Sequence, residues 1–593
     1  MESSVAQDKV GRFEDWFTLS QDQTVDSRAE GERARDYKDG IQLTAEEVAT
    51  LKKRGQPPVV TNRIRRKVEW LKGLEVKQRT DPKAFPRTPK HEAGAESATD
   101  AIRFVCDDQD WDEVRSECYD NFIVEGYCAA EVVHKDKKDG TVDVVINHYP
   151  WDRCFYDPFS RKSDFSDARY KGLVIWVDED DFIHEHSGSR ELCEVAYGQA
   201  SDNDTYDDKP ANVWGDRNLK RVRLLLIWYR EKTEWKWVKF IKGHILEEGD
   251  SPYKDEDGDS VCPLIMESAY IGRENDRHGP IRDMFDPQDE INKRGSKALH
   301  ILNSNQTMGV KGAVSSVAAM KREKANPDGH IEFSIEAMED AMRAGVRPLE
   351  FIPQNDKFAG EIGLLQEAKR EIDLLGANSA LAGEDGPSAS GRAVLAKQQG
   401  GMIEIASLSD KMNRFTRTIY RHIWMRIRQY WKEERWIRVT DDEDTARFVG
   451  LNRPITLEEQ LGTMDPQQAQ ALAMQLGLYP GDPRLGEVVG IDNNVEQLDV
   501  DIIIEEVPDR ITLAGEAFEA LLKYGPAIPP AVLIEADPSL PTQRKEKLLK
   551  LLQETPPDPM KAAEAEDKQA SAIERQAHAQ KYQAETNAIM GGF

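Results

Sequence analysis

The 593-residue sequence lacks the short motifs that identify most enzyme families. It contains no Gly-x-x-x-x-Gly-Lys-Ser/Thr for a P-loop, no Gly-x-Gly-x-x-Gly for a dinucleotide, no His-Glu-x-x-His for zinc and no Gly-x-Ser-x-Gly for a hydrolase. Carboxylates are abundant, but their spacing marks no pair for acid–base chemistry. Active sites are assembled in space, so these absences weigh against an enzyme without deciding the question. We predict no catalytic residue and no cofactor.

The sequence also lacks long apolar runs and paired cysteines. No stretch approaches the eighteen apolar residues of a membrane-spanning helix, and the first residues lack the basic and apolar regions of a signal peptide. Six cysteines are irregularly spaced and form no Cys-x-x-Cys pair. We therefore expect reduced, mostly buried thiols, no membrane partner, and a protein made and kept in a cytoplasm-like compartment.

Candidate metal ligands are few. His184 and His186 are two residues apart in a predicted helix, and side chains at that spacing do not share a face. The acidic segments 202–208 and 255–259 do not keep the register of an EF-hand, which needs Gly at position 6 and Glu at position 12. We predict no metal site, with adventitious calcium on the acidic segments as the alternative.

The charge balance is strongly acidic, with 80 Lys and Arg against 108 Asp and Glu and a net charge of −28. Tight binding to duplex DNA comes mainly from Lys and Arg on phosphates, so the composition does not predict a tight DNA-binding protein. It favours a protein that is kept soluble by its charge. As an alternative, acidic walls would suit a conduit that lets DNA slide past.

Residues 284–432 dominate the predicted organisation as a helix, a compact insert, a second helix, a Gly-rich loop and a very long helix. Asp286 suits an N-cap and Pro287 the first helical position. One face then carries residues at helical spacing: Ile291, Gly295, Ala298, Leu299 and Leu302. We expect the small residues of this helix to let a neighbouring helix approach closely; they are Gly295, Ser296 and Ala298.

The second helix is predicted at about 358–376, with apolar residues on one stripe. These are Phe358, Ile362, Leu365, Ala368, Ile372 and Leu375. The two helices would span roughly 25 and 28 Å and can pair side by side. The insert, 310–356, suits a small α/β tip with a helix ending near Lys324, a strand at 330–334 and a helix at 335–343.

The Gly-rich loop, 378–391, is punctuated by Gly and Pro, which deny it a regular element. We expect a mobile loop, followed by a helix from Arg392 to about Lys432 with a kink at Gly400 and Gly401. Beyond the kink one face of this helix is apolar: Ile405, Leu408, Met412, Phe415, Ile419, Ile423, Ile427 and Tyr430. The opposite face is basic: Arg414, Arg417, Arg421 and Arg428.

Outside this region the pattern alternates between helices and strands. Short helices are expected in 8–55, including a solvated helix at 28–37 and one opened by a capping box at 44–47, and further helices up to residue 73 and over 96–132. A hairpin spans 127–134 and 142–148. The other expected strands are 173–177, 222–229, 235–241, 263–268, 435–440, 446–451 and 498–507. The expected C-terminal helices are 457–462, 465–476, 511–523 and 541–553.

Two stretches resemble a known family, the portal proteins, which are head-to-tail connectors of tailed double-stranded-DNA bacteriophages. Gly279-Pro-Ile-Arg-Asp-Met-Phe-Asp-Pro-Gln-Asp-Glu-Ile-Asn-Lys-Arg294 resembles the start of the stem helix in the short-tailed-phage type. Ser390-Gly391-Arg392-Ala393, followed by Gln398-Gln399-Gly400, resembles the family's exit from the tunnel loop into its long kinked helix. The resemblance covers roughly 25–450 in the family's order and is weak beyond.

The resemblance implies an α+β, portal-like fold with a β-rich wing, an antiparallel helical stem carrying a small α/β clip, a long kinked helix and a mostly helical crown. The implied parts are the wing with an N-terminal helical arm (1–280), stem helix 1 (281–309), clip (310–356), stem helix 2 (357–377), tunnel loop (378–391), long kinked helix with wing strands (392–455), crown (456–556), and a C-terminal helical barrel or tail (557–593).

The same resemblance implies roles for particular residues. The tunnel loop would line a DNA channel with Gly383, Glu384, Asp385, Gly386, Pro387, Ser388, Ser390 and Gly391. In the clip, Lys321, Arg322 and Lys324 would face terminase, an adaptor or DNA, with a solvated helix end as the alternative. The basic face of the long helix would meet acidic surface of its own or the next subunit.

The implied function is that of a portal: a ring, dodecameric as the resemblance implies, at one capsid vertex of the virion. It would be the conduit for packaging and ejection of double-stranded DNA, assembled in the host cytoplasm. Its expected partners are major capsid and scaffolding proteins, terminase and tail adaptor proteins. Two alternatives are a helical scaffold or adaptor of another assembly and a hydrolase with a helical lid. Closure into a ring separates the portal from both.

Overall fold

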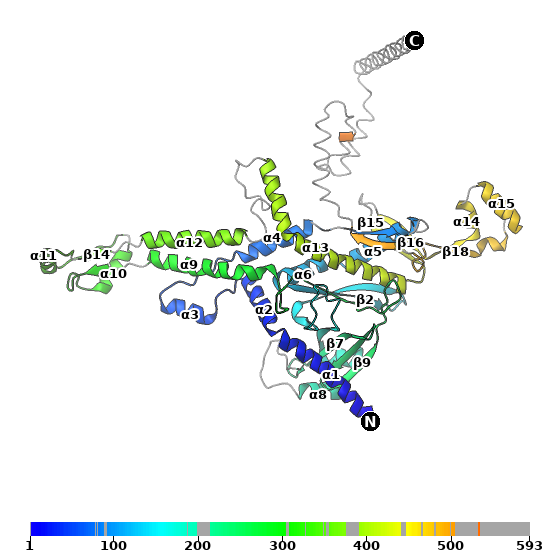
Figure 1. The fold of residues 1–593 in the computed structure, drawn as a ribbon, viewed down its shortest axis with the longest axis horizontal. Helices are drawn as coiled ribbons and strands as arrows, with labels where there is room; N and C mark the ends of the chain where they lie inside the picture. The colour runs from blue at the N-terminus through cyan, green and yellow to red at the C-terminus, as the bar shows by residue number, and fades with distance from the viewer. Residues whose placement is uncertain are drawn as a thin grey trace, which may run out of the picture. The chain divides into compact units, whose positions relative to one another are not determined.

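The computed structural model describes most of the chain up to residue 504. The described residues are 2–77, 79, 81–87, 92–186, 188–198, 214–303, 307–326, 328–347, 349–351, 355–374, 391–440, 446–463, 466–479, 482–498, 500–504 and 532–533. The chain divides into two compact units, one of Met1–Val439 with Ala446–Glu505 and one of Thr440–Thr445 with Glu506–Phe593. The elements below belong to the first unit (Figure 1).

The chain begins with four helices: α1 (Glu2–Gln23), α2 (Val25–Asp39), α3 (Ala45–Lys53) and α4 (Ile64–Lys77). The predicted capping box opens α3, with Thr44 and Glu47 exchanging backbone and side-chain hydrogen bonds. The expectation of a solvated helix at 28–37 is wrong. Gly31, Ala34 and Tyr37 of α2 are buried because the helix packs against the body of the unit.

The central layer is a three-stranded antiparallel sheet in the order β10-β2-β3. Its strands are β2 (Tyr127–Asp136), β3 (Val142–Tyr149) and β10 (Leu264–Ser268). The predicted hairpin is confirmed, with Val133 opposite Val145. Helices α5 (Glu92–Asp108) and α6 (Trp111–Val124) precede the sheet, and their buried residues join its own in the largest hydrophobic core.

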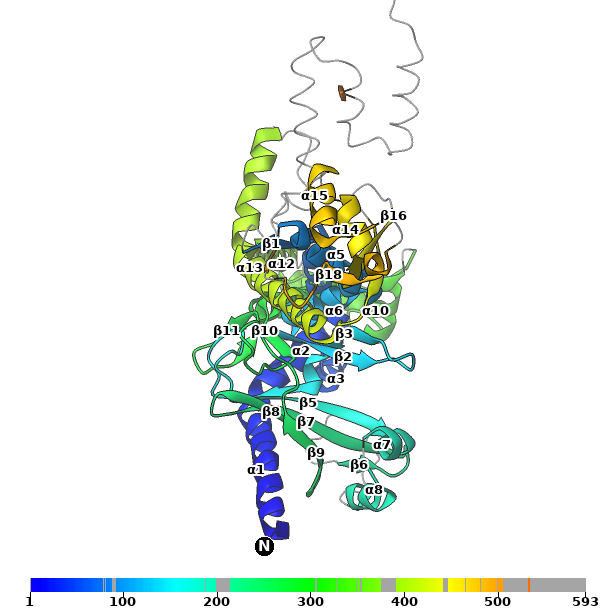
Figure 2. The ribbon, with the colours of Figure 1, turned by 90° about the vertical axis from the view of Figure 1, so that its right-hand side faces the viewer.

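A second antiparallel sheet has the order β4-β5-β7-β8-β9, with β6 beside β7. The strands are β4 (Cys154–Tyr156), β5 (Tyr170–Asp178), β6 (Gly215–Asp216), β7 (Arg221–Glu231), β8 (Glu234–Ile241) and β9 (His244–Asp250). Phe13 and Phe17 of α1 pack into the core of this sheet beside Phe155 and Phe240. Figure 2 shows α1 lying beside this sheet. Helices α7 (Glu179–Glu185) and α8 (Arg190–Tyr197) pack at the β5 and β7 strands.

The central region begins with β11 (Tyr270–Ile271), β12 (Arg277–His278) and a short 3-10 helix, Pro280–Met284. Then come α9 (Phe285–Asn303), β13 (Thr307–Gly309), α10 (Val317–Ala325), α11 (Ile335–Arg343), β14 (Leu349–Phe351), α12 (Asn355–Leu374) and α13 (Gly391–Tyr430). The predicted strand at 330–334 is wrong, because that segment has no strand conformation; the insert's strands are β13 and β14, which pair with each other. Helix α13 is continuous in its hydrogen bonding, and its ribbon bends along its length (Figure 1).

After α13 the chain forms β15 (Arg435–Thr440) and β16 (Ala446–Leu451), the predicted pair. Further elements are β17 (Arg453–Thr456), α14 (Leu457–Thr463), α15 (Pro466–Leu476), β18 (Val488–Asp492) and β19 (Val500–Ile504). Only the strand 498–507 was expected beyond residue 456, and this expectation is wrong, because β18 is a second strand there and pairs with β17. Strand β19 pairs with β1 (Pro82–Pro86), which ties the end of the unit to its beginning. The predicted helices at 511–523 and 541–553 lie outside the described residues.

Candidate functional site

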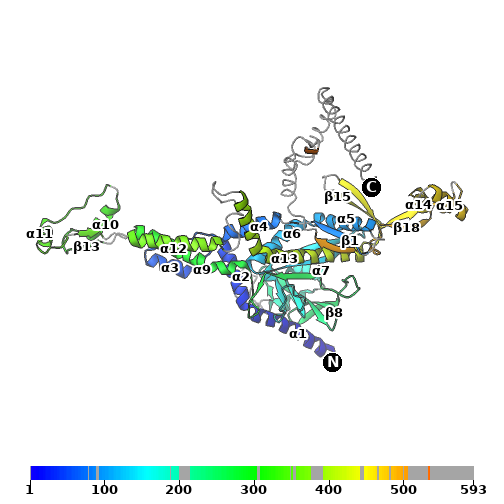
Figure 3. The same ribbon diagram turned by 45° about the horizontal axis from the view of Figure 1, so that its top comes forward.

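The candidate site is the two-helix stem and the tip that it carries. Helices α9 and α12 run side by side, with α10 and α11 beyond their ends (Figures 1 and 3). Ile291 of α9 packs against Ala368 and Ile372 of α12, in a small core that Leu365 partly covers. The pairing predicted for the two helices is therefore confirmed. Leu299 and Leu302, predicted on the same apolar face, are exposed near the tip.

A carboxylate of α12 joins the two stem helices. Glu361 accepts from Arg294 Nη1 at 2.8 Å and also pairs with Lys297. The hydrogen bond from Lys297 holds the pKa of Glu361 below its usual range, and that from Arg294 adds to it. Arg294 also pairs with Glu290, one turn earlier on α9, at 2.5 Å. The pairs fix the helices' register, although partly exposed ion pairs add little stability.

The other face of α9 holds an extended segment, 55–63, which we call the strap. Three side chains one turn apart bond its backbone. Gln288 Oε1 accepts from Arg63 N, Asn292 Oδ1 from Thr61 N and Ser296 Oγ from Val59 N, each at 3.0 Å. Gln288, Asn292 and Ser296 are all buried. A fourth residue, His300, contacts Gly55 O through Nδ1 at 3.0 Å.

The strap corrects one expectation from the sequence. Gly295, Ser296 and Ala298 were expected to admit a helix of a neighbour, but they serve contacts within the chain. A Cβ on Gly295 would meet Val59 of the strap at 3.7 Å, and Ala298 is buried. Polar residues that recur every fourth position beside the apolar stripe of α9 mark a second contact face in the sequence, but they do not identify the strap as its partner.

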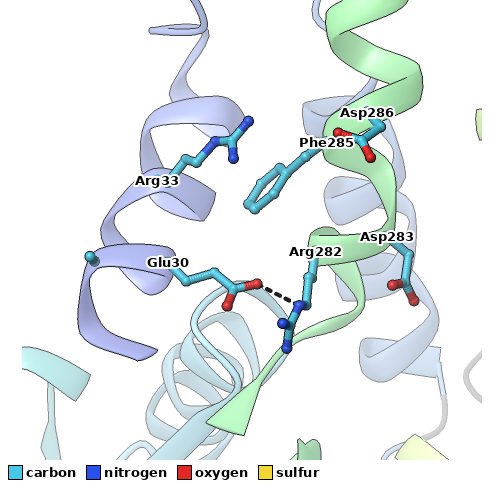
Figure 4. Close-up of a pocket in the computed structure, with 7 residues that line it drawn as sticks. Glu30, Arg33, Arg282, Asp283, Phe285 and Asp286 are labelled. Atoms are coloured by element: carbon cyan, nitrogen blue, oxygen red, sulfur yellow. Dashed lines mark ion pairs between the residues drawn. The ribbon is translucent and has the colours of Figure 1, made fainter. Parts of the chain in front are cut away.

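The base of the stem is held by close backbone contacts and by charges. A Cβ on Gly279 would lie 2.2 Å from Ile123 O, so only glycine fits at the start of the Gly279–Arg294 stretch. Figure 4 shows Arg282 directed at Glu30 of α2, at 2.8 Å, and Arg33 facing Phe285. The Arg33 guanidinium lies 4.5 Å from the centre of the Phe285 ring.

These residues line an open cavity of about 690 Å³ between α2 and the start of α9. Its charged lining contains both signs: Glu30, Arg33, Arg282, Asp283 and Asp286. Because the cations already contact partners of this chain, the cavity presents no single charge to a ligand. We assign it to the attachment of the arm rather than to binding.

The tip carries the predicted basic cluster on α10. Ser316 caps this helix by accepting from Ala319 N, and Met320 anchors it in the tip. Lys321 and Arg322 are exposed, whereas Lys324 is half-buried. The structure therefore presents two of the three cations to solvent, and their use as a terminase, adaptor or DNA contact stays a prediction.

The basic face of α13 is divided among different surroundings. Arg414 forms an ion pair with the buried Glu267 of β10, with its Nη2 at 2.5 Å, so it meets acidic surface of its own chain. Arg428 donates to Glu496 O at 3.2 Å. Arg421 is exposed and Arg417 is half-buried, and a role for them between subunits stays a prediction.

A buried arginine on α13 escaped the sequence analysis. Arg426 is fully buried, donates from Nε to Val132 O at 3.3 Å and lies 4.1 Å from the centre of the Tyr253 ring. Burial lowers the pKa of Arg426 to about 10. Burial also raises the pKa of Glu131, an electrostatic neighbour of Arg426, to about 7. These groups join α13 to the sheets. A lone arginine in an apolar stripe gives no sequence signal for such a position.

Other predicted features have plain outcomes. The tunnel-loop residues 383–388 and Ser390 lie outside the described residues, whereas Gly391 is the first residue of α13.

His184 and His186 lie at the end of α7 and just after it. Within the described part of the chain, no three His, Cys, Asp or Glu side chains are grouped to hold a metal ion. No described helix is long and apolar enough to cross a membrane. Five of the six cysteines are buried, and all six are free thiols.

Comparison with known proteins decides the family. The sequence model of the phage P22-like portal proteins matches residues 14–591, nearly the whole chain. The chain belongs to this family. A curated portal protein of Helicobacter pylori bacteriophage KHP30 is 20% identical over 454 residues, which cover 74% of this chain and 70% of the relative. The chain is therefore a phage portal protein and a structural component of the capsid, as the stem and loop motifs predicted.

Proposed function

We propose that twelve copies of this portal protein close into a ring at one vertex of the capsid, and that double-stranded DNA passes along the ring's axis during packaging and ejection. The family match over residues 14–591 carries the proposal. Membership implies a capsid-associated ring; the number twelve and the path of the DNA are our additions.

The stem supports this function. Two helices that are locked to each other by Ile291, Ala368 and Glu361 make a stiff element, which can stand beside its copies around a channel. The strap stiffens α9 further, because its backbone is hydrogen-bonded to the buried polar side chains on the face of α9 that it covers. A conduit must keep its bore while DNA moves, and such a stem suits that demand.

We propose the division of labour that the sequence indicated. The wing is 1–280 with the strands within 392–455, the stem is 281–309 and 357–377, the clip is 310–356, the crown is 456–556, and 557–593 is a barrel or tail. The tunnel loop, 378–391, contacts DNA with small side chains that grip it weakly. Terminase supplies the energy of packaging and docks on the clip. Tail adaptors dock after packaging, and major capsid and scaffolding proteins bind the ring while it assembles in the host cytoplasm.

Imaging the purified full-length chain tests the ring. Mass photometry should give a species near twelve times the 67.2 kDa subunit, and negative-stain images should show an axial hole. A species that stays at the subunit mass at micromolar concentration, whatever the salt, would refute the proposal. A closed ring of another number would correct only the stoichiometry.

A further inference from the structure

The tip from β13 to β14, residues 307–351, which makes up most of the clip, leaves much of its apolar surface exposed. Among its described residues Ala313, Met320 and Ala341 are buried. Two of these are alanines, and Met320 is the one large apolar side chain among them. Large apolar side chains lie exposed instead, among them Met308, Val317, Ile335, Met338, Met342 and Val346. Ile335 is 76% exposed and Met342 is 69% exposed. An exposed apolar surface on this scale marks an interaction site.

The exposed residues of α11 are ordered around the helix. Ile335, Met338 and Met342 follow the spacing i, i+3, i+7 and form one apolar stripe. Glu336 and Asp340, four residues apart, form an acidic edge beside the stripe. Both carboxylates are exposed. Helix α11 thus presents an apolar stripe with negative charge along one side.

Helix α10 presents the opposite combination. Val317 is exposed in its first turn, and Lys321 lies one turn further along the same face. Arg322 follows, also exposed. The helix thus pairs an apolar contact with positive charge. Apolar surface on one helix can meet apolar surface on the other while unlike charges meet beside it.

Charge favours a second copy of the chain as the partner. Residues 307–351 carry six Lys and Arg and seven Asp and Glu, a net charge of −1, whereas the rest of the chain carries −27. Subunits that repel each other elsewhere can therefore meet at the clip without a net electrostatic cost. Two different complementary surfaces on one tip form a head-to-tail contact, and such contacts close into rings.

We propose that α10 of one subunit packs on α11 of the next, with Lys321 and Arg322 facing Glu336 and Asp340, and that this contact fastens the ring at the clip. The proposal rests on the proposed function and goes beyond it by naming the contact. It also assigns the two exposed cations of α10 to a neighbouring subunit instead of terminase or DNA.

Charge reversal on the full-length chain tests the contact. Lys321→Glu with Arg322→Glu should raise the protein concentration needed for half-assembly at least tenfold, and so should Glu336→Lys with Asp340→Lys. A chain with all four changes should recover most of the assembly, because the charges are exchanged rather than lost. Mass photometry over a concentration series at low and physiological salt measures this.

A matched control separates the contact from net charge. Lys52→Glu with Lys53→Glu on α3 adds the same negative charge at exposed positions away from the clip, and it should leave assembly close to that of the unmodified chain. Thermal unfolding of every variant shows whether the subunit remains folded. The variants change exposed side chains, so we expect unchanged midpoints.

The outcomes are distinct. Rings as stable in both reversal variants as in the control would overturn the contact and leave the ring proposal standing. Loss of assembly in both that the fourfold variant does not restore would also overturn it. Intact rings that no longer bind an acidic partner protein would return Lys321 and Arg322 to a docking role. An unmodified chain that forms no ring would refute the contact and the proposed function together.

Discussion

The side-chain amide of Gln288 bonds the strap in two places. Its Nε2 donates to Thr61 O at 2.8 Å, and its Oε1 accepts from Arg63 N at 3.0 Å. This is the pattern by which a neighbouring strand would satisfy the strap's backbone. Asn292, one turn along α9, bonds the strap once, by accepting from Thr61 N, and donates to the side chain of Gln42 outside the strap, to Oε1 at 2.7 Å. A helix thus takes the place of a sheet edge.

Gln288→Leu should therefore release the strap. The substitution removes two hydrogen bonds to the strap's backbone, at Thr61 O and Arg63 N, and each such bond contributes about 0.5–1.5 kcal/mol net. Limited proteolysis followed by mass spectrometry should show faster cleavage within 55–63. Gln366→Leu, at an exposed position of α12, is the matched control. Equal cleavage in both variants would mean that other contacts hold the strap.

The strap also shows where sequence reasoning stops. The helices of the stem follow from their apolar periodicity, which is a local signal. The predicted N-cap at Asp286 is wrong, because α9 begins at Phe285, so Asp286 and Pro287 lie within its first turn. The partners of Gln288 lie more than two hundred residues earlier, and nothing local at 55–63 indicates a helix as its neighbour. The same reason hid Arg426, whose acceptor Val132 is 294 residues away.

Some strands could likewise be predicted from local sequence, whereas others could not. The hairpin of β2 and β3 was predictable because two runs rich in apolar residues flank the polar turn 136–140, where Gly140 takes a φ of 86°. Strand β9 escaped prediction because most of its residues are half-exposed and three of its seven residues are acidic, as expected for an edge strand. The false strand at 330–334 has alternating residues, but Phe333 is exposed, and the segment is tied to the clip by Ser334 N donating to Ala313 O.

A second prediction concerns pH and the arm. Glu125 lies at the end of α6 and accepts from Arg35 of α2 at 2.6 Å, yet burial raises its pKa to about 8. The same burial would lower the pKa of Arg35, but its bonds to Glu125 and Asp120 raise it. Burial of Glu125 dominates, since its second oxygen has no partner within the described residues.

The direction in which stability changes with pH follows from how many protons Glu125 binds in the folded and unfolded states. A Glu with an ordinary pKa in the unfolded chain and about 8 in the folded chain binds more protons when folded across that interval. The folded state should therefore be more stable near pH 6 than near pH 9, and lose stability as pH rises through 8. Glu125→Gln should flatten this dependence. Thermal midpoints between pH 6 and 9 measure it, and identical slopes in the two proteins would contradict the assignment.

A third prediction concerns the tunnel loop. Removing residues 383–388 should leave ring assembly unchanged, because the stem and clip contacts lie elsewhere in the sequence. Retention of packaged DNA should fall, since the proposed role of the loop is to contact the duplex. Mass photometry gives the assembly, and nuclease-protected DNA in assembled particles gives the retention. A shortened chain that fails to assemble would make the segment structural instead.

The last prediction concerns free DNA. Twelve subunits of −28 carry about −336, and duplex DNA is itself a dense line of negative charge. Tight binding requires Lys and Arg to neutralise phosphates and release counterions, and local basic clusters such as that of Lys321 and Arg322 offer too few contacts to offset that field. At physiological salt the Debye length is about 8 Å, so distant repulsion is screened while repulsion at the channel wall remains.

The assembled ring should therefore show little equilibrium affinity for free duplex DNA at physiological salt. We expect no gel shift at micromolar ring, whatever the sequence of the duplex. The α3 variant Lys52→Glu with Lys53→Glu, which should assemble normally, gives the matching comparison: it should behave like the unmodified chain in this assay, because neither binds. Nanomolar binding that falls steeply with added salt would reveal a continuous basic surface, and a conduit that works by weak contacts would then be the wrong account of this portal.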